Sequence, residues 1–191
     1  MITPQFLQSC QSGDESAIES LVRAHQRPVF QIALSVLDDT QAAGQIDPAV
    51  LREAETATRE TFIAALDRLG RYREDTPFEP WLYGIAVKMS RRRYRRWKMR
   101  AALERLWKRV APAGRPNPYE EKPAPHEARL QPGDAELWAA VRVLPEPMRL
   151  AVVLRYYHDL SIADIARVLR VSEGAIHARL DGARERIAKG A

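Results

Sequence analysis

The sequence has few of the features that mark secreted or membrane-inserted proteins. Cys10 is the only cysteine in 191 residues, so no internal disulfide can form, which is typical of a reducing compartment. No apolar run approaches the roughly 18–20 residues that a membrane-spanning helix needs. The first residues also lack a charged segment followed by an apolar stretch, the pattern of a signal peptide. We therefore expect a cytoplasmic protein without membrane insertion.

Groupings of residues that carry catalysis or hold a cofactor are also missing. The nine glycines are dispersed and form no phosphate-binding loop. No histidine stands at metal-ligand spacing with Cys10 or with a pair of carboxylates. The sequence therefore predicts no enzyme, no metal site and no cofactor. The histidines concerned are His25, His126, His158 and His177.

Alternating β-branched runs are nearly absent, whereas apolar residues recur at helical spacing. This pattern predicts an all-α chain of two small helical domains, residues 1–109 and 134–191. Residues 110–133 are rich in proline and glycine and can build neither a continuous helix nor much core. We expect them to form an extended or disordered linker.

The first domain is predicted to contain several helices. Asp14 is a candidate N-cap for the first of them, and Pro28 should kink or interrupt it. A loop over residues 38–50 should precede a helix of residues 49–69, which Gly70 can stop. After the polar loop 71–77, a further helix should begin near Phe78.

This last helix carries most of the net charge of +5. Such a density of cations, interleaved with Tyr94 and Trp97, is typical of a nucleic-acid interface, because cations bind phosphates and aromatic rings stack on unpaired bases. A solvated charged face and a helix lying on anionic membrane remain alternatives, and Trp81 can equally be a core residue. The cations are Lys88, Arg91, Arg92, Arg93, Arg95, Arg96, Lys98 and Arg100.

The second domain should begin with a helix that buries Leu137, Ala140, Val141 and Leu144, followed by a helix of about residues 147–157. A short helix, a turn at residues 170–172 and a longer terminal helix then form the pattern of a helix-turn-helix, with Ser161 and Ser172 as N-caps. Two packed helices of another bundle are the alternative. The predicted buried stripe of the last helix is Ile176, Leu180, Ala183 and Ile187.

The second helix of such a motif enters the major groove of DNA. Its predicted outward face is poor in donors, because Gly174 and Ala178 share it with Asp181 and Glu185. A carboxylate can accept a hydrogen bond from cytosine, but two carboxylates also repel phosphate. Flanking cations would therefore hold the DNA backbone, which positions the protein without specifying sequence. They are Arg179, Arg184 and Arg186.

Four segments, in this order along the chain, resemble extracytoplasmic-function sigma factors of the sigma-70 family. Residues 60–66 (ETFIAAL) resemble the polymerase-binding segment, and residues 78–86 (FEPWLYGIA) resemble the promoter-melting segment. Residues 144–156 resemble the start of the second domain, and residues 164–180 resemble its helix-turn-helix. The resemblance implies a region 2-like bundle and a region 4-like helix-turn-helix.

The resemblance also implies function. The first domain would bind the β′ clamp helices of core RNA polymerase and open the −10 element of promoter DNA. The second domain would contact the β flap and read the −35 element. An anti-sigma factor would regulate both domains. The implied polymerase-binding residues are Glu55, Arg59, Glu60 and Phe62. The implied −10 residues are Tyr72, Arg73, Phe78, Trp81, Lys88, Arg91, Arg92, Arg95 and Arg96. The implied −35 residues are Ser172, Glu173, His177, Arg179, Asp181 and Arg184.

The chain departs from the family pattern at residues 56–59, at Lys88 and Arg92, and within residues 175–182. Two alternatives remain open, and the departures at residues 56–59 and 181–182 motivate the first of them. A sigma-like decoy would bind an anti-sigma factor without driving transcription, although such a protein has no need of the arginine run. A stand-alone helix-turn-helix regulator would dimerise and bind duplex DNA without polymerase.

Overall fold

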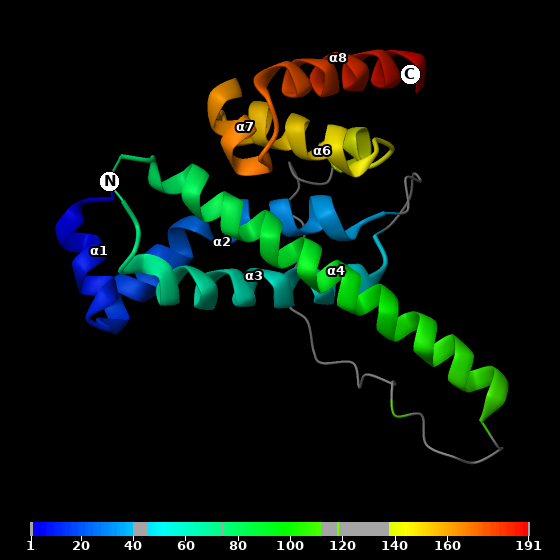
Figure 1. Ribbon diagram of the computed structural model, residues 1–191, viewed down its shortest axis with the longest axis horizontal. Helices are drawn as coiled ribbons and strands as arrows, with labels where there is room; N and C mark the ends of the chain where they lie inside the picture. Colours follow the sequence, from blue (N-terminus) through cyan, green and yellow to red (C-terminus); the bar gives the residue numbers. More distant parts are fainter. Residues whose placement is uncertain (1, 40–45, 74, 112–117, 119–137, 191) are drawn as a thin grey trace.

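The computed structural model describes residues 2–39, 46–73, 75–111, 118 and 138–190 (Figure 1). Every regular element within these residues is helical, which confirms the predicted all-α fold. Helices α1 to α4 form an N-terminal unit, and the helices after residue 138 form a C-terminal unit that packs on it. Apart from residues 110, 111 and 118, the predicted linker lies outside the described residues.

Helix α1 (Pro4–Gln11) was not predicted, because eight residues are too few to display a helical period. Its N-terminus nevertheless has a recognisable cap, since Oγ1 of Thr3 accepts a hydrogen bond from the Phe6 amide at 3.2 Å. Proline in the first turn costs no hydrogen bond. Leu7 and Cys10 anchor the helix in the core.

Helix α2 (Glu15–Leu37) begins at the predicted cap, where Oδ1 of Asp14 accepts from the Ala17 amide at 2.9 Å. The helix continues through Pro28, so the predicted interruption is wrong. Proline removes one backbone hydrogen bond, but apolar residues on both sides of it are buried. Their burial holds the two halves of α2 in one helix; Leu21, Val29 and Ile32 are examples.

Helix α3 (Pro48–Leu69) agrees with the prediction to within one residue. Asp47 caps it by accepting from the Ala49 amide at 2.7 Å, and Gly70 follows its last turn. The face toward the core carries small side chains, which lets α3 pack closely on α2 and α4. The buried small residues are Ala54, Ala57, Ala64 and Ala65.

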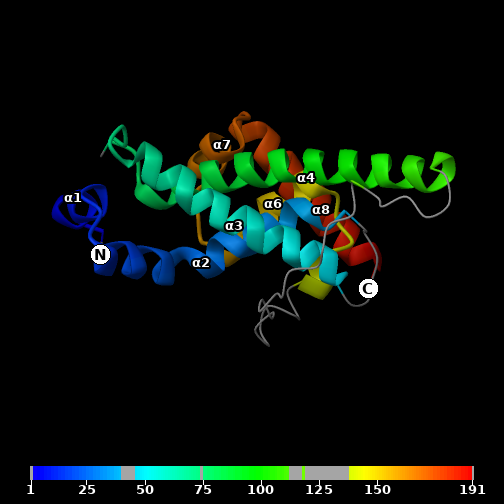
Figure 2. The ribbon, with the colours of Figure 1, turned by 90° about the horizontal axis from the view of Figure 1, so that it is seen from below.

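Helix α4 (Phe78–Val110) has 33 residues and is therefore about 50 Å long. Its first half is buried against α2 and α3, whereas its last part extends beyond the other helices (Figure 2). Three apolar side chains on this extension are more than half exposed: Met99, Leu106 and Val110. None of the helices in the described ranges is both long and apolar enough to cross a membrane.

The C-terminal unit contains α6 (Glu146–Val152), a π-helical turn η1 (Val153–Tyr157), α7 (Ile162–Leu169) and α8 (Glu173–Gly190). Val141 and Leu144 are buried as predicted, but Ala140 is exposed and Leu137 lies outside the described residues. Trp138 is buried in place of Ala140, and burying its indole ring removes more apolar surface from water than burying a methyl group would.

The two units share a buried polar contact. The fully buried Asp38, which follows the last residue of α2, pairs with Arg142 at 2.6 Å and accepts from the Trp138 indole at 3.2 Å. Arg149, only 1% exposed, donates to the carbonyl oxygens of Ser35 and Arg142, both at 3.0 Å. We call these five residues the interdomain cluster.

Candidate nucleic-acid interface

The basic run of α4 divides into paired and unpaired cations. Arg93 and Arg100 contact the buried carboxylate of Glu53 on α3, and Arg96 contacts Glu60 at 3.2 Å. These arginines join α4 to α3. These ion pairs therefore stabilise the packing of α4 on α3. The spacing of charges in the sequence does not distinguish such paired cations from unpaired ones.

Three other cations of the predicted run, residues 88–100, project into solvent without a carboxylate partner among the described residues. Lys88, Arg92 and Arg95 are exposed, and none makes an ion pair within the part of the chain that the structure describes. Arg91 contacts Glu146 of the C-terminal unit at 2.8 Å and remains 38% exposed. The groups available to phosphate are therefore a subset of the predicted run.

Four rings gather where α4 begins. Tyr72 lies 5.1 Å from Trp81 and 5.6 Å from Phe78, and the ring of His25 lies 5.6 Å from Phe78. Phe78 is buried, whereas Tyr72 and Trp81 are half-exposed. Burial of His25 lowers the pKa of its imidazole despite the opposing charge of Glu79. Tyr72 and Trp81 can therefore offer faces to an unstacked base, with Phe78 behind them.

A groove of about 290 Å³ lies between α4 and α7. Trp81 and Lys88 line it from α4, and Arg167 and Arg170 line it from α7, with Arg68 of α3 at its edge. Arg73, by contrast, pairs with Asp75 in the loop before α4 at 3.3 Å. Sequence reasoning did not place Arg167 or Arg170 near α4, because no local pattern reports contacts between distant helices.

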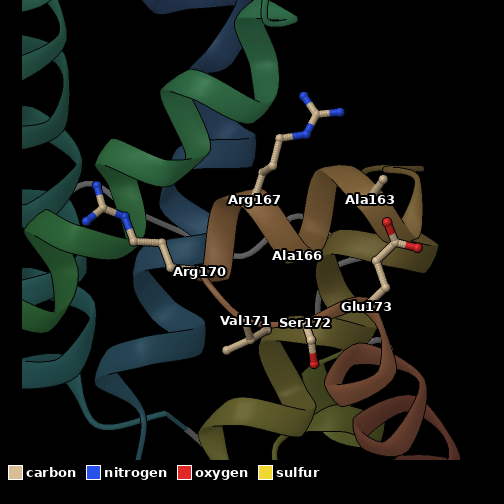
Figure 3. Close-up of a pocket in the computed structure, with 7 residues that line it drawn as sticks. All are labelled: Ala163, Ala166, Arg167, Arg170, Val171, Ser172 and Glu173. Atoms are coloured by element: carbon tan, nitrogen blue, oxygen red, sulfur yellow. The ribbon is translucent and has the colours of Figure 1, made fainter.

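The helix-turn-helix is formed as predicted. Oγ of Ser161 accepts from the Asp164 amide at 3.0 Å, and Oγ of Ser172 accepts from the Ala175 amide at 3.3 Å. Arg170 takes the left-handed conformation, with φ of 56°, that turns the chain between α7 and α8. A shallow cavity of about 610 Å³ lies at this turn. Figure 3 shows the residues that line it, among them Arg167, Arg170, Ser172 and Glu173.

The outward face of α8 also agrees with the prediction: Gly174, Ala178, Asp181 and Glu185 are exposed. Ile176, Leu180 and Ala183 are buried, but Ile187 is 36% exposed, because α8 extends past the helices beneath it. His177 is exposed, whereas Arg179 is only half-exposed. Arg184 pairs with Asp181 at 3.4 Å and donates to the Tyr156 hydroxyl at 2.6 Å.

The predicted polymerase-binding residues all lie on α3. Arg59 is exposed and donates to Thr56, Glu55 and Glu60 are half-exposed, and Phe62 is 6% exposed. The hydroxyls of Thr56 and Thr58, at two of the positions that depart from the family pattern, donate to carbonyl oxygens one turn back. The threonines therefore need no partner outside the helix.

Comparison with protein families identifies both units. Residues 21–100 match the family model for "Sigma-70 region 2", and residues 134–187 match the model for "Sigma-70, region 4". The chain belongs to the sigma-70 family of sigma factors. The matches have the order expected of a sigma factor, so region 2 contains the basic helix α4 and region 4 contains α7 and α8.

Curated relatives are sigma factors, and several are named as members of the extracytoplasmic-function (ECF) type. The chain is 32% identical over 182 residues to the ECF RNA polymerase sigma factor SigE of Mycolicibacterium smegmatis, covering 92% of this chain and 63% of SigE. It is 28% identical over 202 residues to the RNA polymerase sigma-H factor of Pseudomonas aeruginosa, covering 97% and 91%. This ECF sigma factor therefore directs core RNA polymerase to promoter DNA.

Solved structures agree on the fold. The structure of CnrH in complex with the cytosolic domain of CnrY matches with a TM-score of 0.61 at 23% identity, over 97% of this chain and 94% of that one. The sigma factor RpoE in complex with the anti-sigma factor NepR from Bartonella quintana matches with a TM-score of 0.59 at 18% identity, over 90% and 94%. Sigma factors are transcription initiation factors without enzymatic activity. Neither the decoy nor the stand-alone regulator explains the family matches better than a promoter-directing sigma factor does.

Proposed function

We propose that α4 melts and holds the −10 element. Lys88, Arg92 and Arg95 would bind phosphates, because they are the exposed cations of the predicted run, residues 88–100, that no described carboxylate neutralises. Tyr72 and Trp81 would stack on an unpaired base beside them, supported by the buried ring of Phe78. The juxtaposition of Lys88 and the half-exposed Trp81, which line the same groove, carries the proposal. Arg73, Arg91 and Arg96 would join the phosphate contacts once their carboxylate partners yield to DNA.

Region 4 would place the N-terminal part of α8 against the −35 element. Ser172 and Glu173 begin the helix, and His177 projects from its exposed face. Arg179 and Arg184 would hold the backbone, and Asp181 would accept from a base rather than bind phosphate. With so few donors, we expect region 4 to contribute less sequence readout than region 2.

The exposed side of α3 would bind the β′ clamp helices through Glu55, Arg59 and Glu60, with Phe62 supporting them from the core. Region 4 would contact the β flap. We place the domain boundaries at residues 1–109 and 134–191, with residues 110–133 as the linker. The protein would act in the cytoplasm, where RNA polymerase works, and would catalyse no reaction itself.

An anti-sigma factor is the regulatory partner that we propose. One solved structure with this fold contains such a partner, because RpoE is bound there to the anti-sigma factor NepR. In another, CnrH is bound to the cytosolic domain of CnrY. The partner would bind region 2 and region 4 together.

Open-complex formation tests the assignment of α4. The double variant Arg92→Gln/Arg95→Gln should co-elute with core polymerase like the wild type, but permanganate should detect little unpaired thymine at the promoter. The matched control is Arg23→Gln, an exposed arginine on α2 that, among the described residues, pairs with Glu19 one turn away. Normal melting by the double variant would show that these arginines do not hold the −10 element.

A further inference from the structure

The last turns of α4 carry an apolar stripe that is largely open to solvent. Met99 is 62% exposed, Leu106 is 55% exposed and Val110 is 67% exposed, and Leu103 between them is half-exposed. The four residues follow one another at spacings of four, three and four. At about 100° per residue, these spacings keep the four side chains within about 60° of the helix surface. We call these four residues the α4 seam.

The α4 seam faces away from the other helices of region 2. Arg93 and Arg100 contact Glu53 of α3. Lys98 contacts Asp39, which lies just beyond the end of α2. These three cations lie outside the arc of the seam, so the packing of α4 leaves the seam open. Figure 2 shows the last part of α4 continuing beyond α2 and α3.

The spacing of the α4 seam is that of a contact line between two helices. Apolar residues that alternate at spacings of three and four pack into holes on the surface of a partner helix. Single exposed apolar side chains are common on protein surfaces, but several in one stripe mark an interaction site. A stripe of this kind is also narrower than the apolar face with which a helix covers a core or lies on a membrane. The α4 seam therefore fits a partner helix better than a lipid surface.

The residues beside the α4 seam decide which helix fits. They include three arginines and no carboxylate. Arg95 and Arg109 are exposed, and neither makes an ion pair within the described residues. A second copy of this chain could offer these arginines no carboxylate, whereas a helix with acidic flanks would pair with them. The flanking residues are Arg95, Arg100, Ala102, Trp107 and Arg109.

We propose that the α4 seam binds an amphipathic helix of another protein, in which Asp or Glu borders the apolar stripe. Seam-to-seam contact would bury the exposed side chains, and Arg95 and Arg109 would set the register of the partner and exclude basic helices. The proposal goes beyond the assignment of α4 to the −10 element and does not depend on it, because none of the four seam residues is assigned to DNA.

Two synthetic peptides test the proposal. Each contains three heptads, about 21 residues, with leucine at both seam positions, and the flanking positions carry glutamate in one peptide and lysine in the other. Fluorescence anisotropy measures the binding of each peptide to the full-length chain. The wild type should bind the glutamate peptide at least about ten-fold more tightly than the lysine peptide, and Arg109→Glu should reduce this preference.

A double variant tests the apolar contacts. Met99→Gln/Leu106→Gln changes two exposed residues and should weaken binding of the glutamate peptide by about ten-fold or more, because central apolar side chains carry much of the binding energy. Val143→Gln is the control, since it changes an exposed apolar side chain of region 4 and should bind like the wild type. Far-ultraviolet circular dichroism should show equal helix content in all four chains.

Several results would overturn the proposal. They include a wild type that does not bind the glutamate peptide, equal affinity for the two peptides, and unchanged binding by the double variant. Sedimentation equilibrium should show a monomeric wild type, and self-association that the double variant abolishes would assign the seam to a second copy. Binding to vesicles of phosphatidylcholine and phosphatidylglycerol that the double variant abolishes would assign it to lipid. None of these results bears on the proposed function, which promoter melting tests separately.

Discussion

The hydroxyl of Tyr94 on α4 donates to the carboxylate of Asp39, 2.7 Å away, just beyond the end of α2. Lys98 contacts the same carboxylate at 2.6 Å. Burial and the neighbouring carboxylate raise the pKa of Tyr94 to about 12. Burial alone would also raise the pKa of Asp39, but the hydrogen bonds from Lys98 and Tyr94 outweigh it and hold that pKa below its usual value.

Replacing Tyr94 with phenylalanine removes the donor and should lower the free energy of unfolding by about 1–2 kcal/mol at pH 7. The folded state depresses the pKa of Asp39, so the stabilisation is complete above about pH 4 and is lost as the pH falls through the folded value. Urea denaturation at pH 7 and pH 3 measures both effects. A deficit in Tyr94→Phe that is equally large at pH 3 would contradict this account.

His25 should make region 2 less stable in mild acid. Burial lowers the pKa of the folded imidazole, so the unfolded chain takes up a proton first as the pH falls below about 6.5, and stability declines from there. His25→Phe keeps a ring beside Phe78 and removes the titration. Its stability should change less between pH 7.5 and pH 5.5 than that of the wild type. Equal changes in the two proteins would refute the assignment.

Replacing Gly182 and Gly84 with alanine should change the free energy of unfolding by different amounts. A methyl group at Gly182 would lie 2.8 Å from Cε of Met148, whereas one at Gly84 would meet nothing within 4 Å. Gly84→Ala should therefore raise the free energy of unfolding by the full difference in helix propensity between glycine and alanine, about 0.5–1 kcal/mol. Gly182→Ala should gain less, because the end of the Met148 side chain must move. Thermal unfolding of the two variants checks the order, and a larger gain at Gly182 would contradict the close packing of α8 on α6.

Asp181→Arg should strengthen binding of the full chain to duplex DNA of arbitrary sequence. The change replaces a carboxylate on the exposed face of α8 with a cation, and each added phosphate contact steepens the dependence of log K on log salt by about 0.9. Glu19→Arg, on the exposed surface of α2, adds the same charge elsewhere and is the control. If both variants gain equally in a salt titration, this face of α8 does not approach DNA.

Patterns that are local in sequence predicted local structure well. The caps at Asp14, Ser161 and Ser172 and the breaker at Gly70 fix helix ends through contacts within a few residues. The turn of the helix-turn-helix follows from the same chemistry. Helix α1 was missed because its length is about two turns, and the continuation of α2 through Pro28 was missed because distant packing outweighs one lost hydrogen bond.

The residue types of the candidate site were predictable from the sequence, but their arrangement in space was not. The arginine run lies on one helix, α4, as its spacing predicted, but the pairing of its members with Glu53 and Glu60 depends on how α3 lies beside α4. The interdomain cluster was invisible for the same reason. Trp138 and Arg142 carry no motif, and Asp38 lies 100 residues away from Trp138. Such contacts are set by tertiary packing, which a single sequence does not display.

The extension of α4 beyond the bundle has a consequence for the path of the chain. From Arg100, the last residue of α4 that pairs with α3, the helix continues for ten residues, or about 15 Å. A helix is stiff over this length, so the buried half of α4 fixes the direction in which the last turn points. The last residue of α4, Val110, therefore lies away from α2 and α3, at a point set by the packing of Leu82, Ile85 and Met89 in the first half of the helix.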